Sequence, residues 1–331
     1  MADQGCKEPS RLFPVLVGNK WGFIDVSGRV VVQPLFESIA PFSEGLARVY
    51  FNGRLAFVSS SGKTVLERTA SEAQDFSEGL AGVKVGPKWG FIDKSGTMII
   101  DPRFDSVTPF SEGTSAVRVD SEWEYIDRSG KVALMPRANG WDRSYASPFH
   151  EGLALLFSKN GKTGYMGRGG DWIVKPTFDS GQDFEDSFAA VETDGKWGYI
   201  GKDGSLRIAV KFANASSFHD GLAAVRVEES PAVSPLAGFV DTSGISRIPP
   251  QFDDTRDFCE GMAAVNMRGE WGYVNRAGTL VIRQQFKHAG SFSGGLALVV
   301  VEDASQQYHT AYIDKSGTRI WTSAAPVPLV D

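Results

Sequence analysis

The side chains best able to do chemistry in this chain are carboxylates that recur in one short phrase. Each follows a Phe-x pair and in most copies precedes glycine, at Glu44, Glu78, Glu112, Glu151, Asp186, Asp220 and Glu260, and the series is broken at Gly294. A row of this kind can line a groove for cations or basic peptides. A carboxylate beside a glycine can also accept hydrogen bonds from the backbone N–H groups of a turn. Because the glycine recurs with the acid, we expect the turn role.

The residue types that bind metals or act as nucleophiles are sparse. The histidines are too scattered in sequence for a metal site, and no Cys-x-x-Cys or His-Glu-x-x-His pattern occurs; they are His150, His219, His288 and His309. Two carboxylates that meet in a cleft can hydrolyse glycosides, but the sequence does not indicate which two would meet. We therefore expect no metal, no cofactor and no catalytic residue, which predicts a non-enzymatic protein.

The elements that carry these side chains come from an internal repeat. Residues 20–28 read Lys-Trp-Gly-Phe-Ile-Asp-Val-Ser-Gly, and residues 88–96 differ from them at one place. Related phrases bring the number of copies to nine, and five keep the tryptophan, at Trp21, Trp89, Trp123, Trp197 and Trp271. The phenylalanine before the acid recurs at Phe42, Phe76, Phe110, Phe149, Phe184, Phe218, Phe258 and Phe292, with spacings of 34, 34, 39, 35, 34, 40 and 34 residues. The chain is therefore a tandem repeat with a period of 34 residues.

Each copy has the pattern of three short strands. Runs rich in β-branched and aromatic residues alternate with glycine-containing turns, and helical periodicity is absent. The sequence predicts an all-β array over residues 11–322, between tails at 1–10 and 323–331. The nine antiparallel three-stranded units are 11–44, 45–78, 79–112, 113–151, 152–186, 187–220, 221–260, 261–294 and 295–322. A proline follows the third strand in several units and is expected to end it.

Two arrangements of these units are considered. Propeller blades usually have four strands and about 40–45 residues, so the present units are short for a propeller. Closed propellers often divide one blade between the two chain ends, whereas here residues 13–17 already supply a first strand and the last unit is nearly complete. We therefore predict an open β-superhelix, with a closed propeller-like ring as the alternative.

The repeated aromatic residues are expected to form the core. A large ring at a fixed place in every unit can pack against the next unit and bury about 150–250 Å². Where the tryptophan is lost, the replacements are Leu55, Thr163, Ala237 and Ala311. Such replacements are compatible with packing, whereas a ligand-binding residue would not change to leucine or alanine. The tryptophan and phenylalanine series are therefore predicted to be structural.

Insertions mark the places where the chain departs from its repeat. Residues 137–146 lengthen one connection and contain Trp141, Arg143 and Tyr145, whose side-chain types dominate many protein interfaces. We predict that these three residues bind a partner; the alternative for Trp141 is that it folds back to cover the edge of the fourth unit. Two further insertions, at 228–235 and 302–309, lengthen hairpins that lie two units apart.

Composition argues against several classes of partner. The 34 basic and 40 acidic residues give a net charge of −6, and no long basic patch is available for nucleic acid. No run approaches the roughly 18 apolar residues of a membrane helix, so membrane insertion is not expected. Residues 1–10 lack the apolar stretch of a secretory signal, and two cysteines cannot form a disulfide framework. We therefore expect a cytoplasmic location.

The phrase Lys-Trp-Gly-Phe-Ile-Asp-x-Ser-Gly resembles the WG-repeat family, also called KWG repeats, over residues 11–321. The resemblance implies a β-rich array widespread in bacteria and an interaction module without shared catalytic residues. The aromatic hairpins are also similar in design to the cell-wall-binding repeats of choline-binding proteins.

The predicted function is a scaffold that binds an unidentified protein partner. A glycan-binding module is the alternative, and exposure of Trp141, Trp172 or Trp321 in a shared groove would favour it. A hydrolase is the third hypothesis, which a convergent pair of carboxylates in a central pocket would favour.

Overall fold

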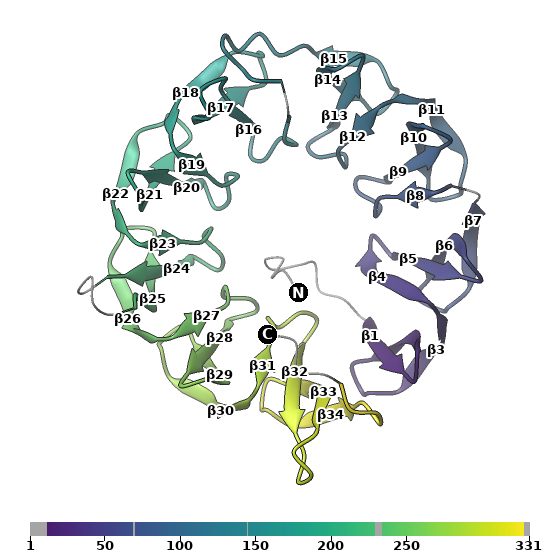
Figure 1. Ribbon diagram of the computed structural model, residues 1–331, viewed down its shortest axis with the longest axis vertical. Coiled ribbons are helices and arrows are strands. Elements are labelled where there is room, and N and C mark those ends of the chain that lie inside the picture. The colour runs from purple at the N-terminus through teal and green to yellow at the C-terminus, as the bar shows by residue number, and fades with distance from the viewer. Residues whose placement is uncertain (1–11, 69, 144, 229–233, 328–331) are drawn as a thin grey trace.

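The computed structural model describes residues 12–68, 70–143, 145–228 and 234–327, and in it the chain forms a closed ring of small sheets (Figure 1). Within these residues nine antiparallel sheets follow one another in sequence order. The molecule is therefore a nine-bladed β-propeller, with blades 1 to 9 numbered from the N-terminus. The all-β repeat is confirmed and the closed alternative is correct, whereas the prediction of an open superhelix is wrong.

Each blade is built from consecutive strands, with the innermost strand first and the outermost last (Figure 1). Blade 3 has the order β8 (Glu72–Ala73), β9 (Leu80–Val85), β10 (Lys88–Asp93) and β11 (Met98–Phe104). Seven blades have four strands in the described residues, whereas the sequence predicted three. The inner strand was missed because in most blades it has only two residues, too few to give a recognisable pattern.

The other blades repeat this order round the ring. Blade 1 contains β1 (Leu12–Val17), β2 (Lys20–Asp25) and β3 (Val30–Phe36), and blade 2 contains β4 (Ser38–Ser43), β5 (Leu46–Phe51), β6 (Arg54–Ser59) and β7 (Thr64–Arg68). Blade 4 contains β12 (Ser106–Val107), β13 (Thr114–Val119), β14 (Glu122–Asp127) and β15 (Val132–Leu134), and blade 5 contains β16 (Leu153–Phe157), β17 (Thr163–Gly167) and β18 (Trp172–Phe178). Blade 6 contains β19 (Ser180–Gly181), β20 (Phe188–Thr193), β21 (Lys196–Gly201) and β22 (Leu206–Phe212). Blade 7 contains β23 (Asn214–Ala215), β24 (Leu222–Val227), β25 (Leu236–Asp241) and β26 (Ser246–Phe252). Blade 8 contains β27 (Asp254–Thr255), β28 (Met262–Met267), β29 (Glu270–Asn275) and β30 (Leu280–Phe286), and blade 9 contains β31 (His288–Ala289), β32 (Leu296–Glu302), β33 (Tyr308–Asp314) and β34 (Arg319–Thr322).

The blades are phased differently from the predicted units. A predicted unit starts after the Phe-x-acid phrase, whereas a blade starts before it, with the inner strand. The predicted tail at 1–10 lies outside the described residues, as do residues 328–331 of the tail at 323–331. Residues 229–233 of the insertion at 228–235 also lie outside them. No helix in the described part of the chain is long and apolar enough to cross a membrane.

The tryptophan–glycine phrase marks a β-bulge. In blade 3 the register of β10 against β11 shifts here, so that Trp89 faces Phe104 while Phe91 faces Ile100. A Cβ atom added to Gly90 would lie 2.5 Å from the carbonyl oxygen of Ile100. The same close approach, at 2.5–2.7 Å from a carbonyl oxygen of the outer strand, is found at Gly22, Gly164, Gly198, Gly238 and Gly272. Glycine recurs at this place because the backbone of the outer strand leaves no room for a side chain.

Blade 2 shows the arrangement without this glycine. It has Ala56 at the same place, and β6 pairs regularly with β7 from Leu55 to Phe57. In blade 9 the strand alignment places Ala311 at the glycine position and Thr310 at the tryptophan position, so the sequence-based assignment of Ala311 to the tryptophan position is wrong. Ala311 likewise pairs with Thr322 in a regular stretch. The glycine and the bulge therefore occur together and are lost together.

We expect Gly90→Ala to destabilise the protein by about 1–3 kcal/mol, because the added methyl group overpacks the bulge against backbone atoms. Urea unfolding followed by circular dichroism measures this change. The comparison is Ala56→Gly, which meets no bulge and should cost about 1–2 kcal/mol, because it raises the backbone entropy of the unfolded chain and removes a buried methyl group. An unchanged unfolding midpoint for Gly90→Ala would show that the bulge does not require glycine.

The prolines predicted to end the third strand lie inside it in four blades. Pro34, Pro102, Pro176 and Pro250 lie within β3, β11, β18 and β26, each the outermost strand of its blade. Proline is tolerated on an edge strand because no neighbouring strand needs its missing N–H donor. These prolines therefore belong to the rim of the ring and do not terminate the sheets.

One kind of aromatic pair recurs at the eight junctions from blade 1 to blade 9. The aromatic residue two places after the tryptophan position meets the phenylalanine of the next blade's turn, with ring centroids 4.7–4.9 Å apart. The pairs are Phe23–Phe42, Phe57–Phe76, Phe91–Phe110, Tyr125–Phe149, Tyr165–Phe184, Tyr199–Phe218, Phe239–Phe258 and Tyr273–Phe292. All these phenylalanines of the turns are buried except Phe42, which is half-buried. The core therefore lies between the blades.

The tryptophans lie at the margin of this core. Trp123 and Trp271 are buried, whereas Trp21, Trp89 and Trp197 are half-buried. The structural role predicted for the two aromatic series thus falls mainly on the phenylalanines and their aromatic partners.

Blades 9 and 1 close the ring through side chains. In each blade, the strand that precedes the Trp-Gly strand has an equivalent second residue. This residue is small in eight blades, namely Ala47, Ala81, Ser115, Ala154, Ala189, Ala223, Ala263 and Ala297. Blade 1 has Phe13 at this place, and its ring lies 5.4 Å from the ring of Tyr312 in blade 9. The Tyr312 hydroxyl donates to the Pro14 carbonyl at 2.9 Å. Within the described residues the two blades share no sheet, so this contact closes the ring.

Candidate functional site

The recurring acids lie in two-residue turns at the inner ends of the blades (Figure 1). Glu78 has φ 52° and Gly79 has φ 80°, the left-handed values of a tight hairpin turn. Six of the seven carboxylates accept a hydrogen bond of 2.9–3.1 Å from a backbone N–H in the turn of the following blade. The acceptor–donor pairs are Glu44–Gly79, Glu78–Gly113, Glu112–Gly152, Glu151–Ser187, Asp220–Gly261 and Glu260–Gly295. The acids therefore accept from turns, as expected, but from those of the neighbouring blade.

Basic side chains of the following blade compensate part of this charge. The ion pairs are Lys94–Glu44 at 3.1 Å, Arg168–Glu112 at 2.7 Å, Lys202–Glu151 at 2.8 Å and Lys315–Glu260 at 3.1 Å. Burial acts to raise the pKa of Glu44 and Glu112, but the hydrogen bonds and the neighbouring bases outweigh it and lower the pKa of both carboxyls. These acids therefore remain ionised and link adjacent blades.

The repeat is interrupted in blade 5. In the described residues this blade has three strands, and in place of a strand paired with β16 the insertion forms an isolated bridge between Trp141 and Ser158. In the adjacent blade 6, the inner strand carries Gly181, and a Cβ atom there would lie 2.6 Å from the Tyr165 hydroxyl oxygen. A pocket of about 730 Å³ opens beside this interruption, at the inner ends of blades 4 to 7.

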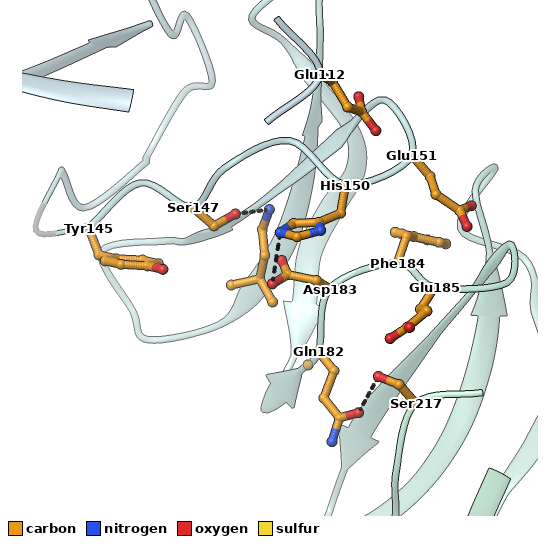
Figure 2. Close-up of a pocket in the computed structure, with 12 residues that line it drawn as sticks. Glu112, Tyr145, Ser147, His150, Glu151, Gln182, Asp183, Phe184, Glu185 and Ser217 are labelled. Carbon is orange, nitrogen blue, oxygen red and sulfur yellow. Dashed lines mark hydrogen bonds and ion pairs between the residues drawn. The ribbon is translucent and has the colours of Figure 1, made fainter. Parts of the chain in front are cut away.

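Figure 2 shows that side chains from several turns converge on this pocket. Its lining consists of Glu112, Tyr145, Ser147, His150, Glu151, Leu155, Gly181, Gln182, Asp183, Phe184, Glu185 and Ser217. Two of the four lining carboxylates pair with Arg168 and Lys202, as described above. The other two face imidazoles: Asp183 Oδ2 lies 3.6 Å from His150 Nε2, and Glu185 Oε1 lies 3.0 Å from His219 Nδ1.

The charge of Asp183 is poorly compensated. Burial raises the pKa of its carboxyl, while His150 and a hydrogen bond from Ser147 oppose the rise and Glu185 adds to it. Burial also raises the pKa of the Tyr145 phenol, and the negative charge of Asp183 adds to that rise. A carboxylate in such surroundings gains stability from any cationic group that enters the pocket.

The three residues predicted to bind a partner are placed in different surroundings. Trp141 is buried, its Nε1 donates to the Tyr145 carbonyl at 3.2 Å, and it joins the apolar cluster between blades 4 and 5. It therefore seals that junction, which was the alternative considered for it. Arg143 is exposed and forms an ion pair with Glu122. Tyr145 is 43% exposed and lines the pocket, so it alone of the three reaches this site.

The sequence contains a signal for the pocket outside the familiar catalytic and metal-binding motifs. Aspartate precedes the turn phenylalanine at Asp75, Asp183 and Asp257, and histidine follows it at His150 and His219. The turns of adjacent blades are in contact, so a histidine after one phenylalanine meets an aspartate before the next. This juxtaposition becomes visible only once the repeats are known to stack blade on blade.

His219 couples three blades. It is 8% exposed, and besides Glu185 at 3.0 Å it faces Asp257, whose Oδ2 lies 3.6 Å from His219 Nε2. Burial lowers the pKa of the imidazole, but the hydrogen bond to Glu185 and the charges of Asp257, Glu185 and Asp186 outweigh it and raise the pKa. Protonated His219 therefore stabilises the folded ring.

We expect the melting temperature to fall as the pH rises above about 6.5, the ordinary pKa of histidine. A raised folded-state pKa contributes stability that is complete below the unfolded-state pKa and is lost as the pH rises through the folded-state value. Thermal unfolding of wild type and His219→Gln across this range measures the contribution. An identical pH dependence in the variant would contradict the assignment to His219.

The other proposed chemistries find less support in the geometry. Among the described residues, no three His, Cys, Asp or Glu side chains form a group suited to a metal ion. The tryptophans named for glycan binding do not line one groove. Trp141 is buried, half-buried Trp172 donates from Nε1 to the Asn139 carbonyl at 2.9 Å, and Trp321 lies in blade 9 with its ring 6.3 Å from that of Tyr312.

Comparison of the sequence with models of known families identifies the repeat. A family model described as "WG containing repeat" matches residues 21–54, 57–89, 89–123, 164–197, 197–229, 238–271 and 271–303, which is more than half of the chain. The chain belongs to the WG-repeat family. Most of these WG repeats begin at the bulge of one blade and end near the bulge of the next, so the sequence repeat spans the junction between two blades.

Solved structures resemble this WG-repeat protein in fold. One, "Crystal structure of the eukaryotic initiation factor", has a TM-score of 0.68 and 13% identity, covering 95% of this chain and 96% of that chain. A computationally designed protein, Ika8, has a TM-score of 0.49 and 11% identity, covering 85% of this chain and 93% of that chain. No curated protein matches the sequence. At 13% identity the first likeness supports the propeller fold alone.

Proposed function

We propose that this WG-repeat propeller is a non-enzymatic scaffold that binds a protein partner through the pocket at the inner ends of blades 4 to 7. The observation that carries the proposal is the pocket of about 730 Å³ beside the interrupted blade 5. Its lining is mainly polar and charged, whereas small-molecule pockets are predominantly apolar. A polar segment of a partner that reaches into the ring fits this lining.

Some side chains in the pocket differ from those that make the contacts between blades elsewhere in the ring. In blades 2 to 4 the residue after the turn phenylalanine is serine, and Ser77, for example, donates to the Phe110 carbonyl at 2.7 Å. In blade 5 this residue is His150, which faces Asp183. In blade 3 the equivalent aspartate, Asp75, pairs with Arg48 at 3.0 Å, whereas Asp183 faces only an imidazole in its ion pair. The repeat's usual contacts are therefore replaced by groups open to a ligand.

A displayed peptide library tests this proposal. Wild-type protein should enrich a set of related peptides, and the double variant Tyr145→Ala/Asp183→Asn should lose them while its melting curve stays close to that of wild type. Asp75→Asn is the matched control, because it makes the same change at the equivalent position of blade 3. Failure to enrich any peptide, or equal enrichment by all three proteins, would reject the pocket as the partner site.

A hydrolase is the second candidate, favoured by the raised pKa of Asp183 among other carboxylates in one pocket. General acids of glycosidases have this property. Chromogenic glycosides and esters distinguish the two candidates. Turnover by wild type that disappears in Asp183→Asn and persists in Asp75→Asn would favour the enzyme, and absence of turnover together with peptide binding would favour the scaffold.

A further inference from the structure

We infer that the pocket receives a cationic side chain, the ammonium of lysine or the guanidinium of arginine, from a basic segment of the partner, with Asp183 as its counterion. The inference rests on the proposed function and names the chemistry of the ligand. It follows from the charge balance of the pocket, from its aromatic side chain and from the direction of its hydrogen-bonding groups.

The charge balance leaves Asp183 in need of a cation. Arg168 and Lys202 lie 2.7 and 2.8 Å from Glu112 and Glu151, so these two acids are already matched by permanently charged bases. Asp183 and Glu185 form their ion pairs with histidines, at 3.6 and 3.0 Å. The raised pKa of His219 lets it compensate Glu185, whereas the partner of Asp183 in its ion pair is the more distant His150. A positively charged ligand removes this imbalance, whereas an anion increases it.

Tyr145 adds an aromatic surface next to this charge. It is 43% exposed, and it lines the same pocket as Asp183, so one ligand can contact both side chains (Figure 2). The face of an aromatic ring attracts ammonium and guanidinium groups. Leu155 and Phe184 supply apolar surface in the same pocket, which suits the aliphatic part of a lysine or arginine side chain.

The amide of Gln182 is fixed so that it offers an acceptor. Its Nε2 donates to the Ala215 carbonyl at 3.2 Å, and its Oε1 accepts from Ser217 Oγ at 3.0 Å. The nitrogen is therefore engaged with the backbone, while the oxygen retains a second lone pair. Carboxylate and amide oxygens together with an aromatic ring form the environment of a bound organic cation.

The test uses fluorescein-labelled hexalysine, hexaarginine and hexaglutamate with the full-length protein, followed by fluorescence anisotropy. The basic peptides should bind more tightly than hexaglutamate, and raising NaCl from about 50 to about 500 mM should weaken them, since salt screens charge. Asp183→Asn should weaken the basic peptides at least about tenfold, which corresponds to about 1.4 kcal/mol. Asp183→Glu keeps the charge and should retain most of the affinity.

Asp75→Asn is the decisive control because it removes the same charge elsewhere on the ring. Affinity should remain within about twofold of wild type in this variant, a difference of well under 1.4 kcal/mol. Equal weakening in Asp75→Asn and Asp183→Asn would mean that the peptides respond to the overall negative charge, and would overturn the inference. If the peptide library enriches sequences without lysine or arginine that still require the pocket, the cation inference fails and the scaffold stands. If no peptide requires the pocket, both fail.

Discussion

Replacing Phe13 by alanine is expected to destabilise the protein by about 3–5 kcal/mol, the usual cost of removing a buried phenylalanine side chain. Alanine is the residue that seven of the other blades have at this position, so a comparison of the repeats alone would rate the change as harmless. The structure predicts the opposite, because Phe13 is buried against Tyr312 where the first and last blades meet. Its loss leaves a cavity at the closure of the ring.

Thermal and urea unfolding of Phe13→Ala measure this effect. Tyr312→Phe is the companion variant, since it keeps the ring contact and removes only the hydrogen bond to the Pro14 carbonyl. Its cost should be about 1 kcal/mol. A Phe13→Ala protein that unfolds at the wild-type midpoint would show that the ring does not depend on this contact.

The second large effect is expected for Phe110→Ala, also about 3–5 kcal/mol. Phe110 is 1% exposed, and its ring centroid lies 4.9 Å from that of Phe91 in the preceding blade. Removal of the side chain opens the junction between blades 3 and 4. From the sequence alone, a loss of this size would be assigned to Trp89, the most conspicuous residue of the repeat.

The matched comparison is Trp89→Ala, which should cost less than Phe110→Ala because Trp89 is half-buried. Both variants truncate an aromatic residue at the same junction, so the difference between their unfolding free energies isolates the effect of burial. A larger loss of unfolding free energy for Trp89→Ala would show that the tryptophans contribute more to the core than the phenylalanines, contrary to the packing described above.

The repeat and its all-β character could be predicted because every unit contains the recurring phrase and the short β-rich runs in its own local sequence. The ring could not, because closure depends on contacts between the first and last blades, which lie at opposite ends of the chain. Phe13 differs from the small residues at its position, but this difference is visible only after the strands of all blades have been aligned. The glycine of the repeat was likewise visible in the sequence, whereas its cause, the approach of the Ile100 carbonyl oxygen to Gly90, belongs to the opposite strand.

The candidate site was predicted in part for the same reason. Tyr145 was found because it lies in an insertion, and the insertion does border the pocket. Trp141 was assigned to binding by its residue type, yet a large aromatic side chain also suits the sealing of a gap between blades, which is its place in the structure. His150 and Asp183 belong to different repeats, and only the stacking of blades brings them together.

The prolines on the outermost strands bear on how copies of this protein behave in a concentrated solution. An outer strand exposes a row of backbone donors and acceptors that a strand of another molecule can pair with, the first step toward edge-to-edge fibres. Proline removes one donor from that row and places a ring in its way. With Pro34, Pro102, Pro176 and Pro250 in this position, four blades carry a local block to such growth. These prolines thus disfavour strand pairing between molecules at the outer edge of the ring. They do not affect binding of a partner at the inner turns.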